Sequence, residues 1–281
     1  MFVLVYILDK NVVVEDNKVN IVTSFYPVYI ATLNITDGVD NVSVTNLTDN
    51  VTGCLHDYTL TTEQMVALSK CDAFIINGAG MEGFMDKVIS NYSNLDIIDS
   101  SKNITLITDT EHNETNSHIF ASVSNNITQV KNITEGLCKI DSKNKELYED
   151  NANKYILELE SLQKEITECV SNVENKNIVT FHESFDYFAK EFNLNVVATI
   201  EEEHGKMPSA KEVANITEQV KSKNVKAIFV EPDSNVKLAE TIAKEAGAKV
   251  YTLNPVTSGK QNQTAYIDIM KGNIEVLKEA L

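Results

Sequence analysis

Three histidines occupy positions from which two halves of the chain could share one metal ion. His56 lies in a loop that follows a predicted strand, His182 comes directly after another, and His118 leads out of a long polar segment. Imidazole is the commonest protein ligand for zinc, and three imidazoles with one further donor complete a tetrahedral site. The three residues are far apart and lack the short-range spacing of a zinc finger. From spacing alone, each is equally compatible with a structural or surface histidine.

Other polar side chains also follow predicted strands. Asn254 comes after a strand at 250–253, Glu231 after one at 227–230, and Glu183 directly after His182. Ligands of open parallel sheets bind beyond the carboxyl ends of the strands. Asn254 is therefore a candidate site residue. The two glutamates are candidates for hydrogen-bond acceptors of a ligand imidazole rather than for ligands.

Alternating strand and helix patterns must position these residues. The apolar runs predict strands and helices in the following order: strand 19–24, helix 27–33, strand 42–45, helix 62–69, strand 73–77, helix 82–90, strand 95–98 and helix 123–138, then strand 178–181, helix 185–192, strand 196–200, helix 209–223, strand 227–230, helix 236–246, strand 250–253 and helix 266–280. Capping boxes at Thr61/Gln64 and Ser209/Glu212 mark two helix starts. The alternation predicts an α/β protein of two lobes, each a mostly parallel sheet flanked by helices.

A long helix at 145–173 separates the two patterns. Its apolar residues recur in steps of three and four and form one narrow stripe: Tyr148, Ala152, Tyr155, Leu159, Leu162, Ile166, Cys169 and Val173. One stripe on a helix about 40 Å long is typical of a strut between two bodies, or of half a short coiled coil. Because both flanks are α/β units, we interpret it as a rigid linker between an N-terminal lobe (19–140) and a C-terminal lobe (174–281), with the linking segment at 141–173.

The segment 100–117 is polar and carries His112 among acidic residues. A loop of this length is usually functional or disordered. It is a candidate for metal capture or a solvated loop, and the run from Glu201 to His204 is interpreted as a solvated face.

The overall charge excludes several partners. The formal net charge is −17 and the pI is about 4.7, which argues against nucleic acid and anionic membranes. The apolar stretch 1–8 is too short to span a bilayer, so it is either part of a longer export signal or an extra strand, and the mode of anchoring is open. Glycosylation-type triplets support an exported protein and begin at Asn34, Asn41, Asn46, Asn50, Asn91, Asn103, Asn113, Asn126, Asn132, Asn215 and Asn262.

Four cysteines, Cys54, Cys71, Cys138 and Cys169, form no CxxC pair and so indicate no zinc ribbon or redox site. A disulfide between Cys54 and Cys71 is compatible with the sequence, but spacing does not fix the pairing. Cys169 lies on the helix stripe and is predicted to be a packed thiol.

Several motifs, taken together and in order, resemble the zinc- and manganese-type solute-binding proteins of ABC transporters. They cover about 19–281 and read Val22-Thr-Ser-Phe-Tyr-Pro27, Gly53-x-x-His56-Asp-Tyr58, Asn77-Gly-Ala-Gly-x-Glu82, Thr180-Phe-His182-Glu-Ser-Phe-Asp-Tyr-Phe188, Ile228-Phe-Val-Glu231-Pro and Ala239-Glu-Thr-Ile-Ala-Lys-Glu-Ala-Gly-Ala-Lys-Val250. The resemblance implies two lobes joined by a rigid helix and a metal ion held between them.

The same resemblance implies the ligands His56, His118 and His182, with Asn254 at the fourth position. The family usually has Asp-Pro before the second histidine, whereas this chain has Asn116-Ser-His118. It often has a carboxylate where this chain has Asn254. Since manganese favours carboxylate oxygens, the neutral amide favours Zn²⁺ as the transported ligand over Mn²⁺.

The expected protein is therefore an extracytoplasmic, monomeric binding protein whose partners are a divalent metal ion and an ABC transporter membrane permease, and not an enzyme. A zinc hydrolase with Glu183 or Glu231 as base is an alternative, but the sequence contains no HExxH pair. A binder of an iron–siderophore or a corrinoid is another. The binding grooves for such ligands are generally lined by aromatic and basic side chains, and the chain has no Trp and no Arg.

Overall fold

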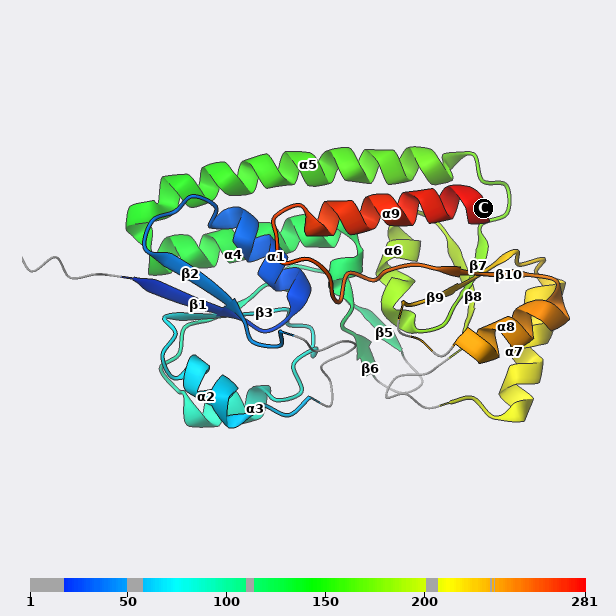
Figure 1. The fold of residues 1–281 in the computed structure, drawn as a ribbon, viewed down its shortest axis with the longest axis horizontal. Helices are drawn as coiled ribbons and strands as arrows, with labels where there is room; N and C mark the ends of the chain where they lie inside the picture. Colours follow the sequence, from blue (N-terminus) through cyan, green and yellow to red (C-terminus); the bar gives the residue numbers. More distant parts are fainter. Residues whose placement is uncertain (1–17, 50–57, 110–113, 201–206, 233, 235) are drawn as a thin grey trace, which may run out of the picture.

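Two parallel sheets lie side by side under a layer of helices in the computed structural model (Figure 1). The structure describes residues 18–49, 58–109, 114–200, 207–232, 234 and 236–281. The N-terminal sheet has the order β2 (Val42–Asn46), β1 (Val19–Thr23), β3 (Ala73–Ile76) and β4 (Ile97–Asp99). The C-terminal sheet has the order β10 (Lys249–Thr252), β9 (Ala227–Val230), β7 (Asn177–Thr180) and β8 (Asn195–Thr199). The predicted α/β class with two lobes is confirmed.

Helices cover these sheets and connect their strands. They are α1 (Tyr26–Ile35), α2 (Thr62–Leu68), α3 (Met85–Asn91), α4 (Val123–Ile140), α5 (Lys145–Ser171), α6 (Asp186–Glu191), α7 (Ala210–Ser222), α8 (Val236–Ala246) and α9 (Ala265–Ala280). Both predicted capping boxes are present, at Thr61/Gln64 before α2 and at Ser209/Glu212 before α7. Each box satisfies two backbone donors at a helix start.

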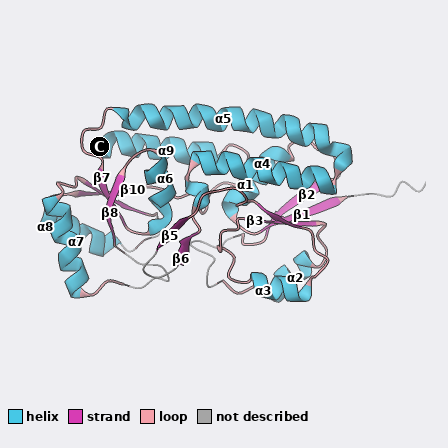
Figure 2. Cartoon of the chain, turned by 180° about the vertical axis from the view of Figure 1, so that it is seen from behind, coloured by secondary structure: helices cyan, strands magenta, loops and turns pink. Residues whose placement is uncertain are grey.

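Helix α5 runs along the top of both lobes, with α4 beneath its first half and α9 beneath its second (Figures 1 and 2). It has 27 residues, or about 40 Å. The predicted stripe is buried from Tyr148 to Ile166, but Val170 continues it. The sequence prediction missed Val170, whereas Cys169 and Val173 are only partly buried.

The α5 stripe belongs to one apolar core that extends through both lobes. The same cluster of buried side chains contains Ile30 of α1, Leu159 of α5, Phe188 of α6 and Leu277 of α9. The C-terminal sheet and the N-terminal sheet have further clusters on their other faces. The lobes are therefore joined by a shared core as well as by the chain itself.

The polar segment 100–117 is not simply a loop. It contains the antiparallel pair β5 (Ile107–Asp109) and β6 (Glu114–Asn116), which the sequence prediction missed. This pair lies between the lobes in both ribbon views (Figures 1 and 2). A one-turn helix, η1 (Ile119–Ala121), follows and leads into α4.

Cys71 is a free thiol, and its Sγ donates to the carbonyl of Leu68. The structure therefore gives no support to its pairing with Cys54, which lies outside the described residues. Cys138 and Cys169 are also free thiols. Within the described ranges, no helix is both long and apolar enough to cross a membrane. The boundaries chosen for the lobes, 19–140 and 174–281, stay a prediction.

Candidate metal centre

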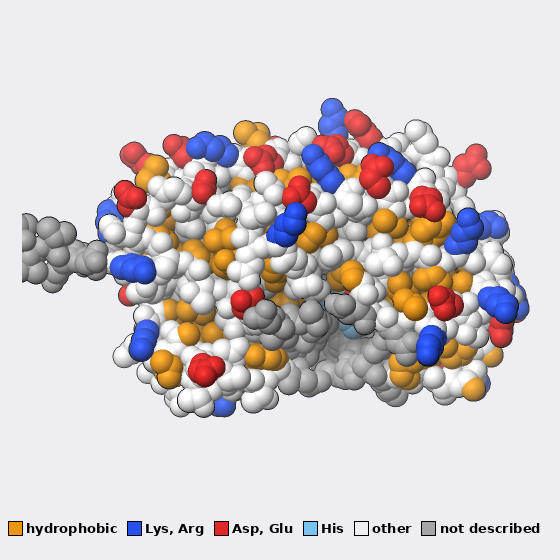
Figure 3. Space-filling model, viewed as in Figure 1, with side chains coloured by type: hydrophobic (Ala, Val, Ile, Leu, Met, Phe, Trp, Pro, Cys, Tyr) orange, Lys and Arg blue, Asp and Glu red, His pale blue; other side chains and the backbone are white. Residues whose placement is uncertain are grey.

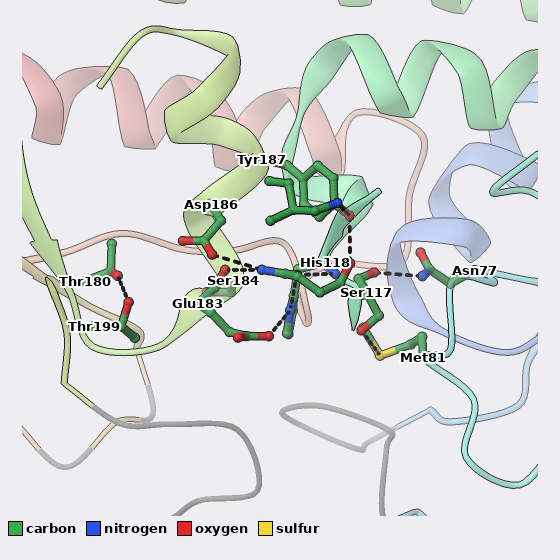
Figure 4. A network of polar contacts seen from close by, with 12 residues as sticks. Asn77, Met81, Ser117, His118, Thr180, Glu183, Ser184, Asp186, Tyr187 and Thr199 are labelled. Atoms are coloured by element: carbon green, nitrogen blue, oxygen red, sulfur yellow. Dashed lines mark hydrogen bonds and ion pairs between the residues drawn. The ribbon is translucent and has the colours of Figure 1, made fainter. Parts of the chain in front are cut away.

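His118 lies at the junction of the lobes, two residues after the end of β6. Its side chain is completely buried. Figure 4 shows it between Glu183 and Asp186 of the C-terminal lobe on one side and Ser117 and Asn77 of the N-terminal lobe on the other. Because the buried imidazole has polar neighbours in both lobes, contacts with both lobes fix its position.

The N-terminal sheet holds the backbone just before His118. Asn77, the first residue after β3, donates from Nδ2 to the carbonyl of Ser117 at 3.0 Å. Asn77 is in turn fixed by Glu82, whose Oε1 accepts from the Asn77 N–H at 2.7 Å. The turn between them needs Gly78, because its φ is +77° and an added Cβ would lie 2.1 Å from Asp99 Oδ1.

Asn116 holds the imidazole itself. Its Oδ1 accepts from the backbone N–H of His118 at 2.9 Å and lies 3.0 Å from His118 Nδ1. Its Nδ2 donates to the Glu183 carbonyl at 3.0 Å and to Asp186 Oδ2 at 3.2 Å. Asn116 therefore connects His118 to the C-terminal lobe.

His182 approaches His118 from the other lobe. It follows β7, the strand at which the strand order of this parallel sheet reverses. The next strand in the chain, β8, lies on one side of β7, and β9 lies on the other. That is the position at which open α/β sheets bind ligands. The ring centroids of His118 and His182 are 5.0 Å apart and the rings are nearly perpendicular, at 87°. The structure thus brings two of the predicted ligands together, one from each lobe.

Acidic groups lie next to His118 and along the segments that flank the two imidazoles. Glu183 Oε1 lies 3.7 Å from His118 Nδ1, which is an ion-pair distance rather than a hydrogen bond. Ser184 Oγ donates to Glu231 Oε1, so the carboxylate after β9 is tied to the segment after β7. Burial raises the pKa of Asp186 to about 6, and the hydrogen bond from Asn116 opposes that rise. Negative charge near the imidazoles favours a cation in the site.

Asn254 follows β10, and β9 separates that strand from β7. Its Oδ1 accepts from the N–H of Val256 at 2.8 Å, and its backbone groups pair with the side chain of Asn273. These bonds hold a turn in which Val256 has a φ of +67°, a conformation that β-branched residues rarely adopt. Asn254 thus has a structural task in the turn, and its role as fourth ligand stays a prediction.

His56 lies outside the described residues, as do Cys54, His112 and the run 201–206. Within the part of the chain that the structure describes, no group of three or more His, Cys, Asp and Glu residues is placed to hold a metal ion. Of the predicted histidine ligands, the structure describes His118 and His182. In Figure 3, pale blue histidine atoms are visible between the lobes on the lower side, next to segments drawn in grey.

The sequence interpretation missed two residues that connect the lobes here. Tyr187 donates from its hydroxyl to the carbonyl of Asn116 at 2.7 Å and accepts from the N–H of Ile107 at 2.9 Å. Asp186 accepts from the Asn116 amide. The available signals were the position of Asn116 two residues before His118 and the place of Asp186 and Tyr187 in the motif from Thr180 to Phe188, but neither signal indicated a contact between the lobes.

These features define a class: a two-lobed binding protein whose lobes are joined by a rigid helix and place one imidazole each at their junction. A family model described as "ZnuA: Zinc-uptake complex component A periplasmic" matches residues 21–280. The chain belongs to this family, and the resemblance noted in the sequence is confirmed.

Two curated relatives and one solved structure illustrate the likeness. The chain is 31% identical over 286 residues to the high-affinity zinc uptake system protein ZnuA of Bacillus subtilis, covering 95% of this chain and 89% of that protein. It is 30% identical to the zinc-binding lipoprotein AdcA of Streptococcus pneumoniae, over 94% of this chain but only 56% of AdcA, so it spans about half of that protein's length. The structure of the binding protein FpvC from Pseudomonas aeruginosa in complex with Mn²⁺ superposes with a TM-score of 0.84 at 27% identity, covering 94% of this chain and 98% of that one.

Proposed function

We propose that this protein is the extracytoplasmic substrate-binding component of an ABC importer and that it captures Zn²⁺ between its lobes. The observation that carries the proposal is the pair of imidazoles, one from each lobe, with centroids 5.0 Å apart. Two imidazoles bound to one tetrahedral zinc at about 2.1 Å would have centroids about 5.3 Å apart. The observed spacing therefore suits a shared ion with little rearrangement.

The donor set supports zinc. His118 and His182 offer nitrogen, His56 is proposed as the third ligand, and Asn254 offers at most a neutral oxygen. Zinc accepts such a set, whereas manganese prefers carboxylate oxygens. The relatives from Bacillus subtilis and Streptococcus pneumoniae are named for zinc, and the Mn²⁺ complex of FpvC keeps manganese as the alternative.

The protein acts by binding alone, since delivery of an ion to a membrane permease makes and breaks no covalent bond. Its partners are the metal ion and that permease, and the binding protein itself is proposed to be a monomer. The extracytoplasmic location is supported by the family description, which is periplasmic, and by the AdcA relative, which is a lipoprotein.

The shared core along α5 limits how far the lobes can separate, so binding is expected to shift loops more than to swing lobes. The ligand nitrogens must be unprotonated to bind metal. Affinity is therefore expected to fall as the pH drops through the titration range of histidine.

Calorimetric titration of zinc into the metal-stripped protein tests the proposal. We expect tight binding by the wild type and a loss of at least about 100-fold in His182→Ala and in His56→Ala. His204→Ala is the matched control, because that histidine is predicted to lie on a solvated face, and it should bind as the wild type does. Wild-type affinity no better than millimolar, or an unchanged affinity in His182→Ala, would overturn the proposal. A parallel titration with Mn²⁺ separates the two metals.

A further inference from the structure

The amide of Asn116 uses its whole hydrogen-bonding capacity at the boundary between the lobes. The side chain is only 5% exposed. Its oxygen faces the backbone N–H and Nδ1 of His118, and its nitrogen faces the Glu183 carbonyl and the Asp186 carboxylate. An amide has two hydrogens to donate and two lone pairs to accept with, so all four are matched.

These partners determine which end of the Asn116 amide is the oxygen and which is the nitrogen. The backbone N–H of His118 can only donate, and the Glu183 carbonyl can only accept. A flipped Asn116 would place its NH₂ against the His118 N–H and its oxygen against the Glu183 carbonyl, so both of these contacts would become repulsive. The orientation of the amide therefore follows from the donor and acceptor roles of its partners.

The tautomer of His118 follows from this orientation. Nδ1 lies 3.0 Å from an oxygen that can only accept, so Nδ1 carries the hydrogen. Glu183 Oε1, 3.7 Å from the same nitrogen, favours a hydrogen there as well. Nε2 is then the nitrogen that carries the lone pair, which is the form a metal ion requires.

The same amide connects the two imidazoles. Glu183, which receives one of its hydrogens, is the residue after His182. Asp186, which receives the other, begins α6 in the C-terminal lobe. His118 and the segment after His182 are thus held by opposite ends of one planar group.

We propose that Asn116 is the positioning residue of this centre: it sets the tautomer of His118, and with Asp186 it forms a matched amide–carboxylate pair that fixes the spacing of the two imidazoles across the lobes. An aspartate at position 116 could still accept from His118. It would also present a carboxylate to Asp186 and to the Glu183 carbonyl, where an N–H donor now stands. The pair therefore explains why a neutral amide occupies position 116 in this chain.

A double-mutant cycle at pH 8 tests the pair, with zinc affinity as the first readout, and this arm rests on the proposed function. We expect Asn116→Asp to weaken binding about 10- to 100-fold. Asp186→Asn should change it less than about threefold, because the Asn116 NH₂ can donate to the new amide oxygen. The double variant N116D/D186N should recover most of the loss, because the amide introduced at 186 can donate to the carboxylate introduced at 116. Asn153→Asp, on the exposed face of α5, is the matched charge control.

The ¹⁵N and ¹H NMR spectrum of histidine-labelled, metal-free protein is the second readout and does not depend on metal binding. We expect the His118 imidazole to be protonated on Nδ1 in the wild type and to lose this fixed tautomer in Asn116→Ala, with thermal melts to verify folding. A wild-type His118 protonated on Nε2, or zinc binding by Asn116→Asp as tight as the wild type's, would overturn the inference. A wild type that shows the Nδ1–H tautomer but binds no zinc would instead overturn the proposed function and leave the tautomer assignment standing.

Discussion

The two lobes meet in two chemically different regions, one above the sheets and one at the carboxyl ends of their strands. Above the sheets, α5, α4, α9 and α1 share one apolar core. At the strand ends, the contacts between lobes are polar and include hydrogen bonds of Asn116 and Tyr187 and the approach of Glu183 to His118. Figure 1 shows the helical layer along the top of the molecule and β5 and β6 beneath it, between the two lobes.

The difference indicates a division of tasks. Apolar burial is strong and non-directional, so the helical layer supplies stability and fixes how far apart the lobes are. Hydrogen bonds contribute less net free energy but depend on direction, so the strand-end region orients the imidazoles. Substitutions in the first region should change stability, and those in the second should change metal affinity.

The largest expected effect on stability is that of Leu159→Ala in the helical layer. Leu159 is fully buried in the shared core, and its truncation should lower the free energy of unfolding by about 2–5 kcal/mol in urea titrations. Leu157→Ala is the control, since Leu157 is 66% exposed on the same helix and should cost less than about 0.5 kcal/mol. Zinc affinity of the folded Leu159→Ala protein should stay near that of the wild type, and a large loss of affinity would break the division of tasks.

A slightly smaller effect is expected from Glu82, a buried carboxylate of the N-terminal lobe. Burial raises its pKa from 4.5 to about 7, although Ser24, Asn77 and Gly78 all donate hydrogen bonds to it. Between those two pH values the folded state keeps a proton that the unfolded state has lost, so stability falls as the pH rises through this window. The shift corresponds to about 3 kcal/mol.

Glu82→Gln removes this titration, whereas exposed Glu174→Gln does not. The stability of Glu82→Gln relative to the wild type should therefore increase by about 3 kcal/mol between pH 4.5 and pH 8. The measurement is chemical denaturation at several pH values. A difference that stays constant with pH would show that the carboxylate is ionised throughout and is fully supported by its three donors.

Periodicity and caps predicted most of the fold. The α5 stripe, both capping boxes and the eight strands of the two sheets are local patterns, and each appears within a few residues of its predicted position. The β5 and β6 pair was missed because short polar strands have no apolar alternation. They are held instead by contacts with the other lobe, such as the Tyr187 hydroxyl.

The candidate site was less predictable than the fold. His118 and His182 could be selected because imidazole is a distinctive ligand, and the family resemblance supplied their order. Asn116 and Asp186 are common polar residues, and their role in the site depends on a hydrogen bond between residues 70 positions apart. Such a contact is determined by how the lobes pack, which no local pattern records.

Glu191 makes polar contacts between the lobes inside the helical layer. It therefore tests whether location or polar chemistry distinguishes the two regions. It ends α6 in the C-terminal lobe, and its carboxylate lies at the start of α4 in the N-terminal lobe. It accepts from Ser122 Oγ at 2.6 Å, from the N–H and Oγ of Ser124 at 3.1 and 2.6 Å, and from Gln163 Nε2 of α5 at 2.7 Å. A carboxylate at a helix N-terminus is favoured by the helix dipole.

Glu191→Gln should therefore lower the free energy of unfolding by about 1–2 kcal/mol, because one acceptor oxygen and the charge are lost while all the donors remain. Glu160→Gln, on the exposed face of α5, is the matched control and should be nearly neutral. The cost at Glu191 should shrink as salt is raised, since the dipole interaction is screened. If Glu191→Gln instead left stability unchanged and weakened zinc binding, this contact would belong functionally to the strand-end region, and polar chemistry rather than location would divide the two tasks.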